Sequence, residues 1–269
     1  MYRAIETERE DSHFKDPYAR RLAGPKGEAI LRTLKRARSA AWAPIVRTCL
    51  FDEMIAERIR SGAIDAVLNL AAGLDSRPYR LELPSDLLWV EVDLPGLIDH
   101  KNRELANDRP RCKLERIAAD LSDAQARARV FDELDRRGRK FLVLTEGLLI
   151  YLTDEQVLGL ARDLSARPSF KSWVIDLTSP ETLQYLKRTW GKKLGEAAAP
   201  MIFGPANGSA FLHSAGWNTV EKKSFLQEAV RLDRRMPFAP LWRVASWFMP
   251  REVLKRAREL NGVFRLERH

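Results

Sequence analysis

The stretch IDAVLNLAAGLDSRPYRLELPSDLLWVEVDLPGLIDHK, residues 64–101, decides the fold of this chain. It opens with an apolar run over 66–70, passes through a turn that contains Gly73, and continues into a second apolar run that closes on Asp93. A buried strand, a tight turn and a second strand ending in an acid are typical of the ligand-binding edge of a doubly wound α/β domain. We therefore predict a mostly parallel sheet built around this stretch.

The same alternation of strand and helix patterns continues on both sides of the stretch, which favours βα units. The expected strands lie near 65–70, 87–92, 113–118, 141–146, 171–177, 219–226 and 263–266. Together they predict a seven-stranded, mostly parallel sheet of Rossmann-like type.

A chain of 269 residues fits a single α/β domain. We divide it into a helical N-terminal part, residues 1–62, and a ligand-binding core, residues 63–178. Residues 179–215 interrupt the alternation late in the sheet and are expected to form a lid over the strand ends. Residues 216–269 are expected to complete the sheet.

Helix boundaries are marked by capping residues. Residues 1–15 are charged and mixed, and we expect a mobile lead-in or a flap there. Asp16 followed by Pro17 predicts a helix start. Capping-box spacing predicts two more starts, at Ser122 and at Thr153. The remaining expected helices span about 17–24, 27–37, 40–59, 180–193 and 250–261.

The formal charge is +9, and residues 180–269 carry 16 Lys or Arg against 8 Asp or Glu. An acidic substrate or a nucleic acid would suit such a balance. However, no basic run exceeds two residues, and no motif combines aromatic with basic residues for RNA recognition. We therefore expect a solvated basic surface and no nucleic-acid partner.

Cys49 and Cys112 lie far apart and lack the spacing of a metal site. With no signal peptide in view, these cysteines predict a reduced, cytoplasmic protein that holds no metal. The most apolar window, residues 141–152, is interrupted by Glu146 and is too short to span a bilayer. No membrane segment is expected.

The turn at Gly73 indicates which ligand the sheet binds. A dinucleotide pyrophosphate needs the pattern G-x-G-x-x-G, but Ala71 and Ser76 stand where two of the three glycines belong. S-adenosylmethionine carries no phosphate, and it needs one close backbone approach and an acid for the ribose hydroxyls. Gly73 and Asp93, 20 residues apart, meet both needs.

Two further acids follow other predicted strands, Asp120 after the third and Glu146 at the end of the fourth. Ligands in open α/β sheets bind beyond the carboxyl ends of the strands. Three carboxylates at one edge suit a cationic sulfonium ligand. A dehydrogenase and an RNA-binding protein on the same scaffold remain the alternatives from other functional classes.

Several motifs together resemble the leucine carboxyl methyltransferase family, a class I S-adenosylmethionine-dependent group that includes bacterial O-methyltransferases. These motifs are KDPYAR at 15–20, RT at 47–48, NLAAGLDSRPYRL at 69–81, EVDLP at 91–95, ADL at 119–121 and EGLLIYL at 146–152. The resemblance covers residues 16–155 well and the remainder loosely. It implies S-adenosylmethionine as methyl donor and S-adenosylhomocysteine as product.

The resemblance also implies residue roles at the amino-acid end of the donor. Arg47 would pair with the methionine carboxylate, for which a guanidinium fork is well suited. Glu146 would contact the ammonium group, and Gly73 would pass against the amino-acid portion. The family usually has Gly where this chain has Ala71, so the turn must keep its shape without that freedom.

At the other end of the donor, the resemblance implies that Asp93 holds the ribose. Asp120 would accept a hydrogen bond from the adenine amino group, and Leu121 would lie against the ring. No residue of this set is a metal ligand.

Methyl transfer to oxygen needs alignment above all, and only a hydroxyl acceptor benefits from a base. Tyr151 is the candidate for positioning the acceptor, and His213 and Asp176 are candidate bases. We expect a small-molecule acceptor of secondary-metabolite type, with a protein carboxylate as the alternative. Five aromatic side chains would line an apolar pocket or belong to the core: Trp190, Phe203, Phe211, Trp242 and Trp247. No residue pattern distinguishes a hydroxyl from a carboxylate acceptor or reveals the oligomeric state.

Overall fold

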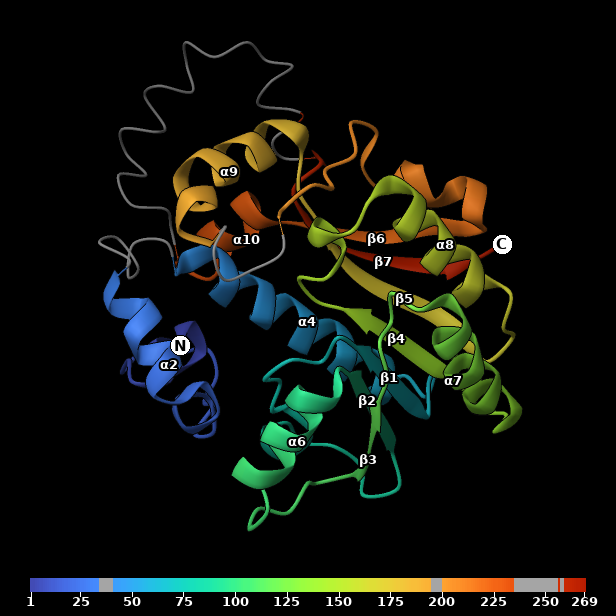
Figure 1. Ribbon diagram of the computed structural model, residues 1–269, viewed down its shortest axis with the longest axis horizontal. Coiled ribbons are helices and arrows are strands. Elements are labelled where there is room, and N and C mark those ends of the chain that lie inside the picture. Colours follow the sequence, from blue (N-terminus) through green and yellow to red (C-terminus); the bar gives the residue numbers. More distant parts are fainter. Residues whose placement is uncertain (34–40, 195–199, 235–255, 257–258) are drawn as a thin grey trace.

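The computed structural model describes residues 1–33, 41–194, 200–234, 256 and 259–269 (Figure 1). Within them, seven strands form one sheet in the order β3-β2-β1-β4-β5-β7-β6. The strands are β1 Ala66–Leu70, β2 Leu88–Asp93, β3 Lys113–Ala118, β4 Phe141–Thr145, β5 Phe170–Leu177, β6 Trp217–Ser224 and β7 Gly262–Arg268. The first five run parallel, and β7 runs antiparallel to both β5 and β6. The predicted mostly parallel, seven-stranded fold is confirmed.

The helices that the structure describes cover both faces of this sheet (Figure 1). They are α1 Tyr2–Thr7, α2 Ala19–Thr33, α4 Trp42–Arg60, α5 Arg77–Arg80, α6 Pro95–Glu104, α7 Ala124–Arg136, α8 Asp154–Ser165, α9 Pro180–Leu194 and α10 Phe225–Arg231, with 3-10 turns η1 Leu149–Tyr151 and η2 Gly208–Ala215.

Two hydrophobic cores lie on opposite faces of the sheet, because side chains alternate along each strand. Leu68 and Val90 pack with α7 and α8 on one face, whereas Val67 and Trp89 pack with α4 and α10 on the other. All five residues of β1 are buried, as expected for a central strand covered by helices on both sides.

The N-terminal segment was predicted to be mobile, and this prediction is wrong. Residues 2–7 form α1, in which Ala4 and Glu6 are buried. Arg3 Nε donates to Asp16 Oδ2 at 2.8 Å, and its Nη2 donates to the Leu74 carbonyl. Long-range ion pairs, which sequence periodicity does not register, therefore hold this short helix against the rest of the protein.

Arg234 provides the second attachment of α1. Its Nε and Nη2 donate to the two carboxylate oxygens of Glu6 at 3.0 and 2.8 Å, and its Nη1 donates to Asp11 Oδ2 at 3.0 Å. The Glu6 side chain is fully buried and that of Arg234 is 6% exposed. Residues 228 positions apart in sequence are thus joined in a buried ion pair.

The predicted helix break at Gly24 is confirmed, since Gly24 has a φ of 56° inside α2. The helix itself begins at Ala19 and not at Pro17. The helical pattern from 40 to 59 is present as α4, in which Ile45 and Met54 are buried.

Of the two predicted capping boxes, the one at Thr153 is confirmed, with Gln156 in the reciprocal role. The one at Ser122 is wrong. The Ser122 hydroxyl and amide both donate to Asp120 Oδ1, at 2.7 and 2.9 Å, so that side chain is already engaged in a local turn. Asp123 caps α7 instead, accepting from the amides of Gln125 and Ala126.

The end of the sheet differs in detail from the sequence prediction. The strand expected at 219–226 is β6, two residues earlier, because Phe225 begins α10. β7 is longer than the predicted 263–266, and it begins at Gly262, where a Cβ would lie 2.2 Å from the Lys223 carbonyl oxygen. Most of the helix predicted over 250–261 lies outside the described residues, although positions 256 and 259 are helical. The assignment of 179–215 as a lid stays a prediction.

Across the described part of the chain, no helix combines the length and the apolar character that a membrane span requires.

Candidate functional site

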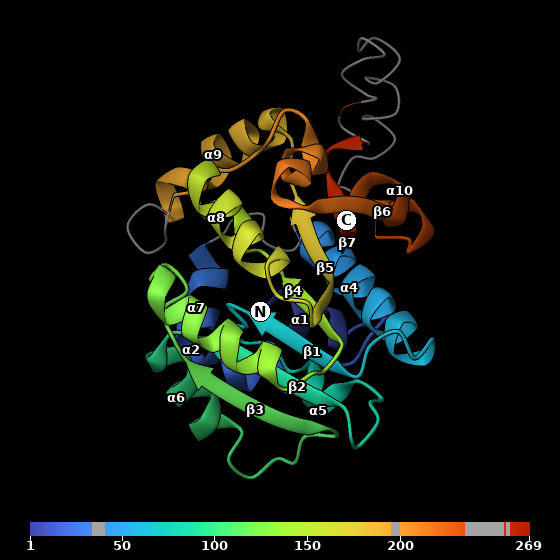
Figure 2. The ribbon, with the colours of Figure 1, turned by 90° about the vertical axis from the view of Figure 1, so that its right-hand side faces the viewer.

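The predicted acidic residues lie in a row along one edge of the sheet. Because the first five strands are parallel, their carboxyl ends share this edge (Figure 2). Following the strand order, the residues at or just beyond these ends are Asp120, Asp93, Gly73, Glu146 and Asp176. The sheet therefore brings together groups that lie up to 103 positions apart in sequence.

The turn after β1 has two residues in the left-handed region, Ala71 with a φ of 52° and Gly73 with a φ of 51°. Ala71 keeps the turn shape that glycine would supply, at a cost of about 1–2 kcal/mol for its side chain. A Cβ at Gly73 would meet no atom closer than 3.9 Å, so open space lies over this backbone. A ligand that packs against the turn would need this space.

Asp93 is held by the backbone. Its Oδ2 accepts from the Gly73 amide at 2.6 Å, and its Oδ1 accepts from the Leu94 amide at 2.7 Å. Asp93 is 6% exposed. Each carboxylate oxygen can accept a second hydrogen bond, so the side chain is fixed in place and retains acceptors for two hydroxyl groups.

Beneath the turn lies an ion-pair network that sequence reasoning missed. Asp75 Oδ2 accepts from Asn69 Nδ2 at 2.8 Å and from Arg77 Nη1 at 2.9 Å. Arg77, whose side chain is 2% exposed, also contacts Asp52 of α4 at 2.6 Å. Burial alone would raise the pKa of Asp75, but the Arg77 charge outweighs burial and holds that pKa well below its usual value. The spacing of Asp75 and Arg77 is visible in the sequence, but the pairing of Arg77 with Asp52 of α4 is not.

Arg47 of α4 lies between two acids of the edge. Its Nε donates to Glu146 Oε1 and its Nη1 to Asp176 Oδ2, both at 3.1 Å. Glu146 Oε2 lies 2.7 Å from Arg77 Nη1, which connects this pair to the network beneath the turn.

The two acids beside Arg47 differ in their proton affinity. Burial alone would raise the pKa of Glu146, but the Arg77 and Arg47 guanidiniums outweigh it, so the pKa lies below its usual value. Asp176 has a raised pKa, because burial outweighs the attraction of Arg47. Glu146 is therefore the more firmly ionised of the two.

The charge balance of this cluster favours a cationic ligand. Three guanidiniums face four carboxylates, which leaves one negative charge in excess; the members are Arg47, Arg77, Arg80, Asp52, Asp75, Glu146 and Asp176. Asp93 lies outside this set and adds a further acid to the same edge. Within the described residues, Nη2 of Arg47 has no hydrogen-bond partner and remains available for a carboxylate. The residues present thus fit a ligand that carries a sulfonium, an ammonium and a carboxylate group.

Asp120 and Leu121 lie at the β3 end of the row. Asp120 is exposed, and the Ser122 hydroxyl and amide lower its pKa by donating to Oδ1. Its Oδ2 makes no hydrogen bond with the described residues. Leu121 is half-buried and packs against the core. Both residues follow β3, next to the end of β2 that carries Asp93.

Tyr151 lies at the edge, whereas His213 does not. Tyr151 is half-buried in η1, six residues after β4 ends. His213 is exposed in η2, which leads into the start of β6 at Trp217. Trp217 pairs with Arg268, the last residue of β7, next to the amino end of β5. His213 therefore lies toward the opposite end of the sheet.

Two of the five aromatic residues predicted for a pocket or the core belong to the core. Phe203 is 3% exposed and its ring packs edge to face on Phe211, with the ring centroids 5.3 Å apart. The side chains of the other three, Trp190, Trp242 and Trp247, lie outside the described residues.

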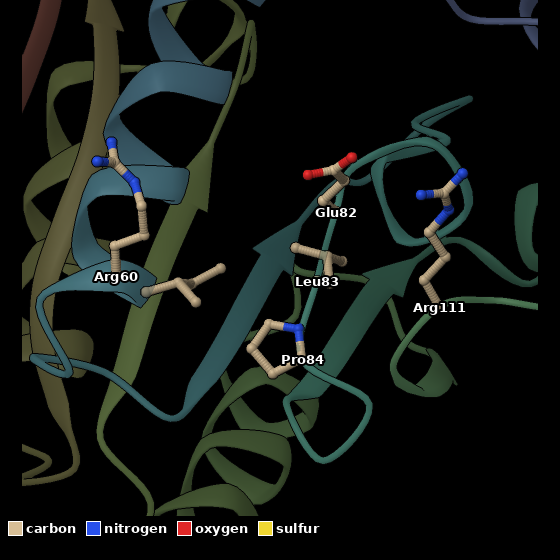
Figure 3. A pocket seen from close by; sticks show the side chains of 6 residues that line it. Arg60, Glu82, Leu83, Pro84 and Arg111 are labelled. Carbon is tan, nitrogen blue, oxygen red and sulfur yellow. The ribbon is translucent and has the colours of Figure 1, made fainter.

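A hollow of about 490 Å³ lies away from the row of acids (Figure 3). It is lined by Ile59, Arg60, Glu82, Leu83, Pro84 and Arg111. Arg60 ends α4, Pro84 precedes β2 and Arg111 precedes β3, so this hollow lies at the amino ends of the strands. It is separate from the edge that carries Asp93.

A relative from Saccharopolyspora erythraea, described as a candidate S-adenosyl-L-methionine-dependent methyltransferase, is 36% identical over 187 residues. The match covers 62% of this chain and 61% of that protein. The chain spans about three fifths of the length of the curated relatives it matches.

Two solved structures share the fold. A DUF574 family protein from Streptomyces avermitilis superposes with a TM-score of 0.60 at 15% identity, covering 99% of this chain and 95% of that one. Magnesium protoporphyrin IX methyltransferase from Synechocystis PCC 6803, solved with bound S-adenosylhomocysteine, gives a TM-score of 0.53 at 11% identity, covering 93% and 98%. The protein therefore has the fold of class I methyltransferases.

The sequence model of one family matches residues 1–165, more than half of the chain. This segment contains the turn at Gly73 together with Asp93, Asp120 and Glu146. The resemblance noted from the motifs is thereby confirmed, and the chain belongs to the leucine carboxyl methyltransferase family.

Proposed function

We propose that this protein is an S-adenosylmethionine-dependent O-methyltransferase that methylates a hydroxyl or carboxylate oxygen of a small molecule. The observation that carries the proposal is the row at the carboxyl edge, in which Asp93 is fixed by the Gly73 amide at 2.6 Å and an acidic cluster lies beyond it. Membership of the family supports the same reaction.

Asp93 and Gly73 would hold the ribose and the adjoining part of the donor. The Asp93 carboxylate keeps one acceptor position on each oxygen, which matches the two ribose hydroxyls. Because backbone amides fix the carboxylate, little conformational entropy is lost when a ligand binds it. Asp120 and Leu121 would take the adenine ring at the β3 end of the row.

Arg47 and Glu146 would hold the amino-acid end. The unbonded Nη2 of Arg47 suits a carboxylate, and the Glu146 carboxylate suits an ammonium group. These contacts orient the donor along the edge, with the sulfur between the ribose and amino-acid ends.

S-adenosylmethionine, when bound, supplies a methyl group that is already activated by the sulfonium charge. The contribution of the protein is to align the acceptor oxygen and exclude water, which is worth roughly 7–11 kcal/mol in well-oriented systems. Tyr151 would orient the acceptor, since its hydroxyl makes no hydrogen bond within the part of the chain that the structure describes.

A carboxylate acceptor needs no base, and the position of His213 offers none at this edge. Asp176 is poorly suited as a base, because its side chain is only 12% exposed and its Oδ2 is paired with the Arg47 guanidinium. A hydroxyl acceptor would therefore have to be acidic. This favours a carboxylic acid or a phenol.

Exposed apolar side chains support an apolar small molecule as the acceptor. Leu94, directly after Asp93, is 50% exposed, and Ile202 is 39% exposed. The Ile202 amide donates to the Ile150 carbonyl at 2.7 Å, which places Ile202 beside Tyr151. Apolar surface thus lies close to both the predicted ribose position and the predicted acceptor position.

The first test is isothermal titration of the protein with S-adenosylmethionine and S-adenosylhomocysteine. We expect both to bind, and absence of binding to either would refute the proposal. The second test incubates the protein with cell extract and a donor carrying an isotopically labelled methyl group. Mass spectrometry should then reveal a labelled methyl ester or ether of a small molecule, whereas label only on protein would favour a protein carboxylate acceptor.

A further inference from the structure

Asp176 is the acid of the carboxyl edge that the sequence motifs of the family do not include. β5 carries it next to Glu146 of β4, and its side chain is 12% exposed. Its Oδ1 accepts from the Gly147 amide at 2.6 Å, and its Oδ2 accepts from Arg47 Nη1 at 3.1 Å. One buried carboxylate therefore joins β5, the turn after β4 and helix α4.

The guanidinium of Arg47 lies directly against that turn. Gly147 has a φ of 67°, and a Cβ there would lie 3.0 Å from Arg47 Nη1 and 3.3 Å from Cζ. The Arg47 guanidinium therefore packs against the backbone of Gly147. The Asp176 carboxylate fixes both groups, because it accepts from the Gly147 amide and from Arg47 Nη1. A small shift of Asp176 would therefore move the Gly147 turn and the Arg47 guanidinium together.

Asp176 has a different relation to Arg47 than Glu146 has. Glu146 is shared with Arg77, whose other contacts lie beneath the turn. Among the described residues, Arg47 is the only guanidinium within ion-pair distance of Asp176. The raised pKa of Asp176, caused by burial and partly offset by Arg47, is consistent with a carboxylate that depends on this one cation.

We infer that Asp176 is a positioning residue that orients Arg47 and the Gly147 turn, and so sets the affinity of the site for the α-amino-acid group of its ligand. This inference rests on the proposed function. Asp176 contacts no ligand in this scheme; it directs the unbonded Nη2 of Arg47 toward the carboxylate. The adenosine part of the ligand, held at Asp93 and Asp120, is expected to be insensitive to it.

The test compares two ligands that differ only at the amino-acid end. S-adenosylhomocysteine carries the amino acid, whereas 5′-methylthioadenosine has a methyl group in its place. In Asp176→Asn, the amide would present a donor to either Arg47 or Gly147. We expect the Kd for S-adenosylhomocysteine to rise about 10- to 100-fold, while the Kd for 5′-methylthioadenosine stays within about twofold of the wild-type value.

The matched control is Asp163→Asn on α8, which removes the charge of an acid paired with Arg127 of α7. Neither Kd should change in this variant. Equal weakening of both ligands by Asp176→Asn would show a merely structural role and overturn the inference. If Asp176→Asn does not fold, judged by circular dichroism, Asp176→Glu takes its place with the same expected pattern.

A double-mutant cycle shows whether Asp176 acts through Arg47. Arg47→Lys keeps the charge but loses the fork that reaches two acids. If Asp176 works by orienting Arg47, adding Asp176→Asn to Arg47→Lys should raise the Kd for S-adenosylhomocysteine by no more than about twofold. If Asp176→Asn instead raises the Kd for S-adenosylhomocysteine by the same factor in Arg47→Lys as in the wild-type protein, the inference is overturned. Wild-type protein that binds neither ligand would instead refute the proposed function itself.

Discussion

Ala71 shows how neighbouring contacts preserve a turn whose backbone conformation its own side chain disfavours. Its φ of 52° lies in the region that favours glycine. The left-handed conformation costs an L-residue about 1–2 kcal/mol, and the Asp75 and Asp93 hydrogen bonds around the turn hold it there. The turn is therefore determined by its neighbours as well as by its own sequence.

Replacement of Ala71 by Gly should relieve this strain. Part of the gain is lost to the greater freedom of glycine in the unfolded chain, so we expect the free energy of unfolding to rise by up to about 1 kcal/mol. Urea denaturation measures it. The control is Ala72→Gly. Ala72 is the next residue and has no positive φ, so this substitution should lower the free energy of unfolding. Equal destabilisation of the two variants would contradict strain at Ala71.

Asp93 provides the second prediction at this scale. Asp93→Ala removes both acceptors proposed for the ribose, and we expect the affinity for S-adenosylhomocysteine to fall at least about 10- to 100-fold. Asp99→Ala, an exposed acid on the adjacent α6, serves as the control in the same titration. The ribose assignment fails if the two variants bind alike.

At the scale of elements, α8 shows how capping decides where a helix begins. Thr153 accepts from the Gln156 amide at 3.2 Å, and Gln156 Oε1 accepts from the Thr153 amide at 2.8 Å. The same spacing at Ser122 produces no box, because Ser122 donates to Asp120 instead. Identical sequence signatures thus have different outcomes when a nearby acid competes for the hydroxyl.

Removing each hydroxyl should separate these two cases. Thr153→Ala is expected to lower the free energy of unfolding by about 1 kcal/mol, the usual value of an N-cap. Ser122→Ala removes only an exposed local hydrogen bond and should change it by less than about 0.5 kcal/mol. Chemical denaturation of the two variants provides the comparison, and a larger loss at Ser122 would contradict the assignment of Asp123 as the cap.

The strands, α4 and the acids of the carboxyl edge could be predicted because their signals are local: apolar runs, helical periodicity and an acid after a strand. The pairing of Arg77 with Asp52 and of Arg47 with Asp176 could not, since each joins residues far apart in sequence. His213 was named as a base because of its surroundings in sequence, yet the antiparallel β7 places it toward the other end of the sheet. Sequence patterns carry no direct information about such distances.

At the scale of the whole molecule, the ion pair between Glu6 and Arg234 connects the first helix to the last third of the chain. Glu6 is completely buried, so loss of Arg234 would leave its carboxylate with only the more distant Arg9 Nε, 3.8 Å away, as a cationic partner in the described residues. This pair differs from the many exposed pairs of the surface. Its removal should therefore affect stability far more than theirs.

We expect Arg234→Ala to lower the free energy of unfolding by about 3–5 kcal/mol. The matched control is Arg231→Ala, three residues earlier, where an arginine with a 48% exposed side chain pairs with Glu53 and Glu228. Its loss should cost less than about 1 kcal/mol. Denaturation curves for both variants test the contrast, and similar losses would mean that burial of Glu6 is not decisive.

The attachment of α1 also has a consequence for the order in which the protein is assembled. Glu6 of α1 is synthesised 228 residues before Arg234, the arginine that neutralises it. Contacts of such separation form late, since a long loop must close before they contribute. The Leu74 carbonyl beside the Gly73 turn accepts from Arg3 of α1. A nascent chain that already contains all five parallel strands would therefore still lack a firmly seated wall beside the turn, and the affinity proposed for S-adenosylmethionine should be acquired only after Arg234 has been synthesised.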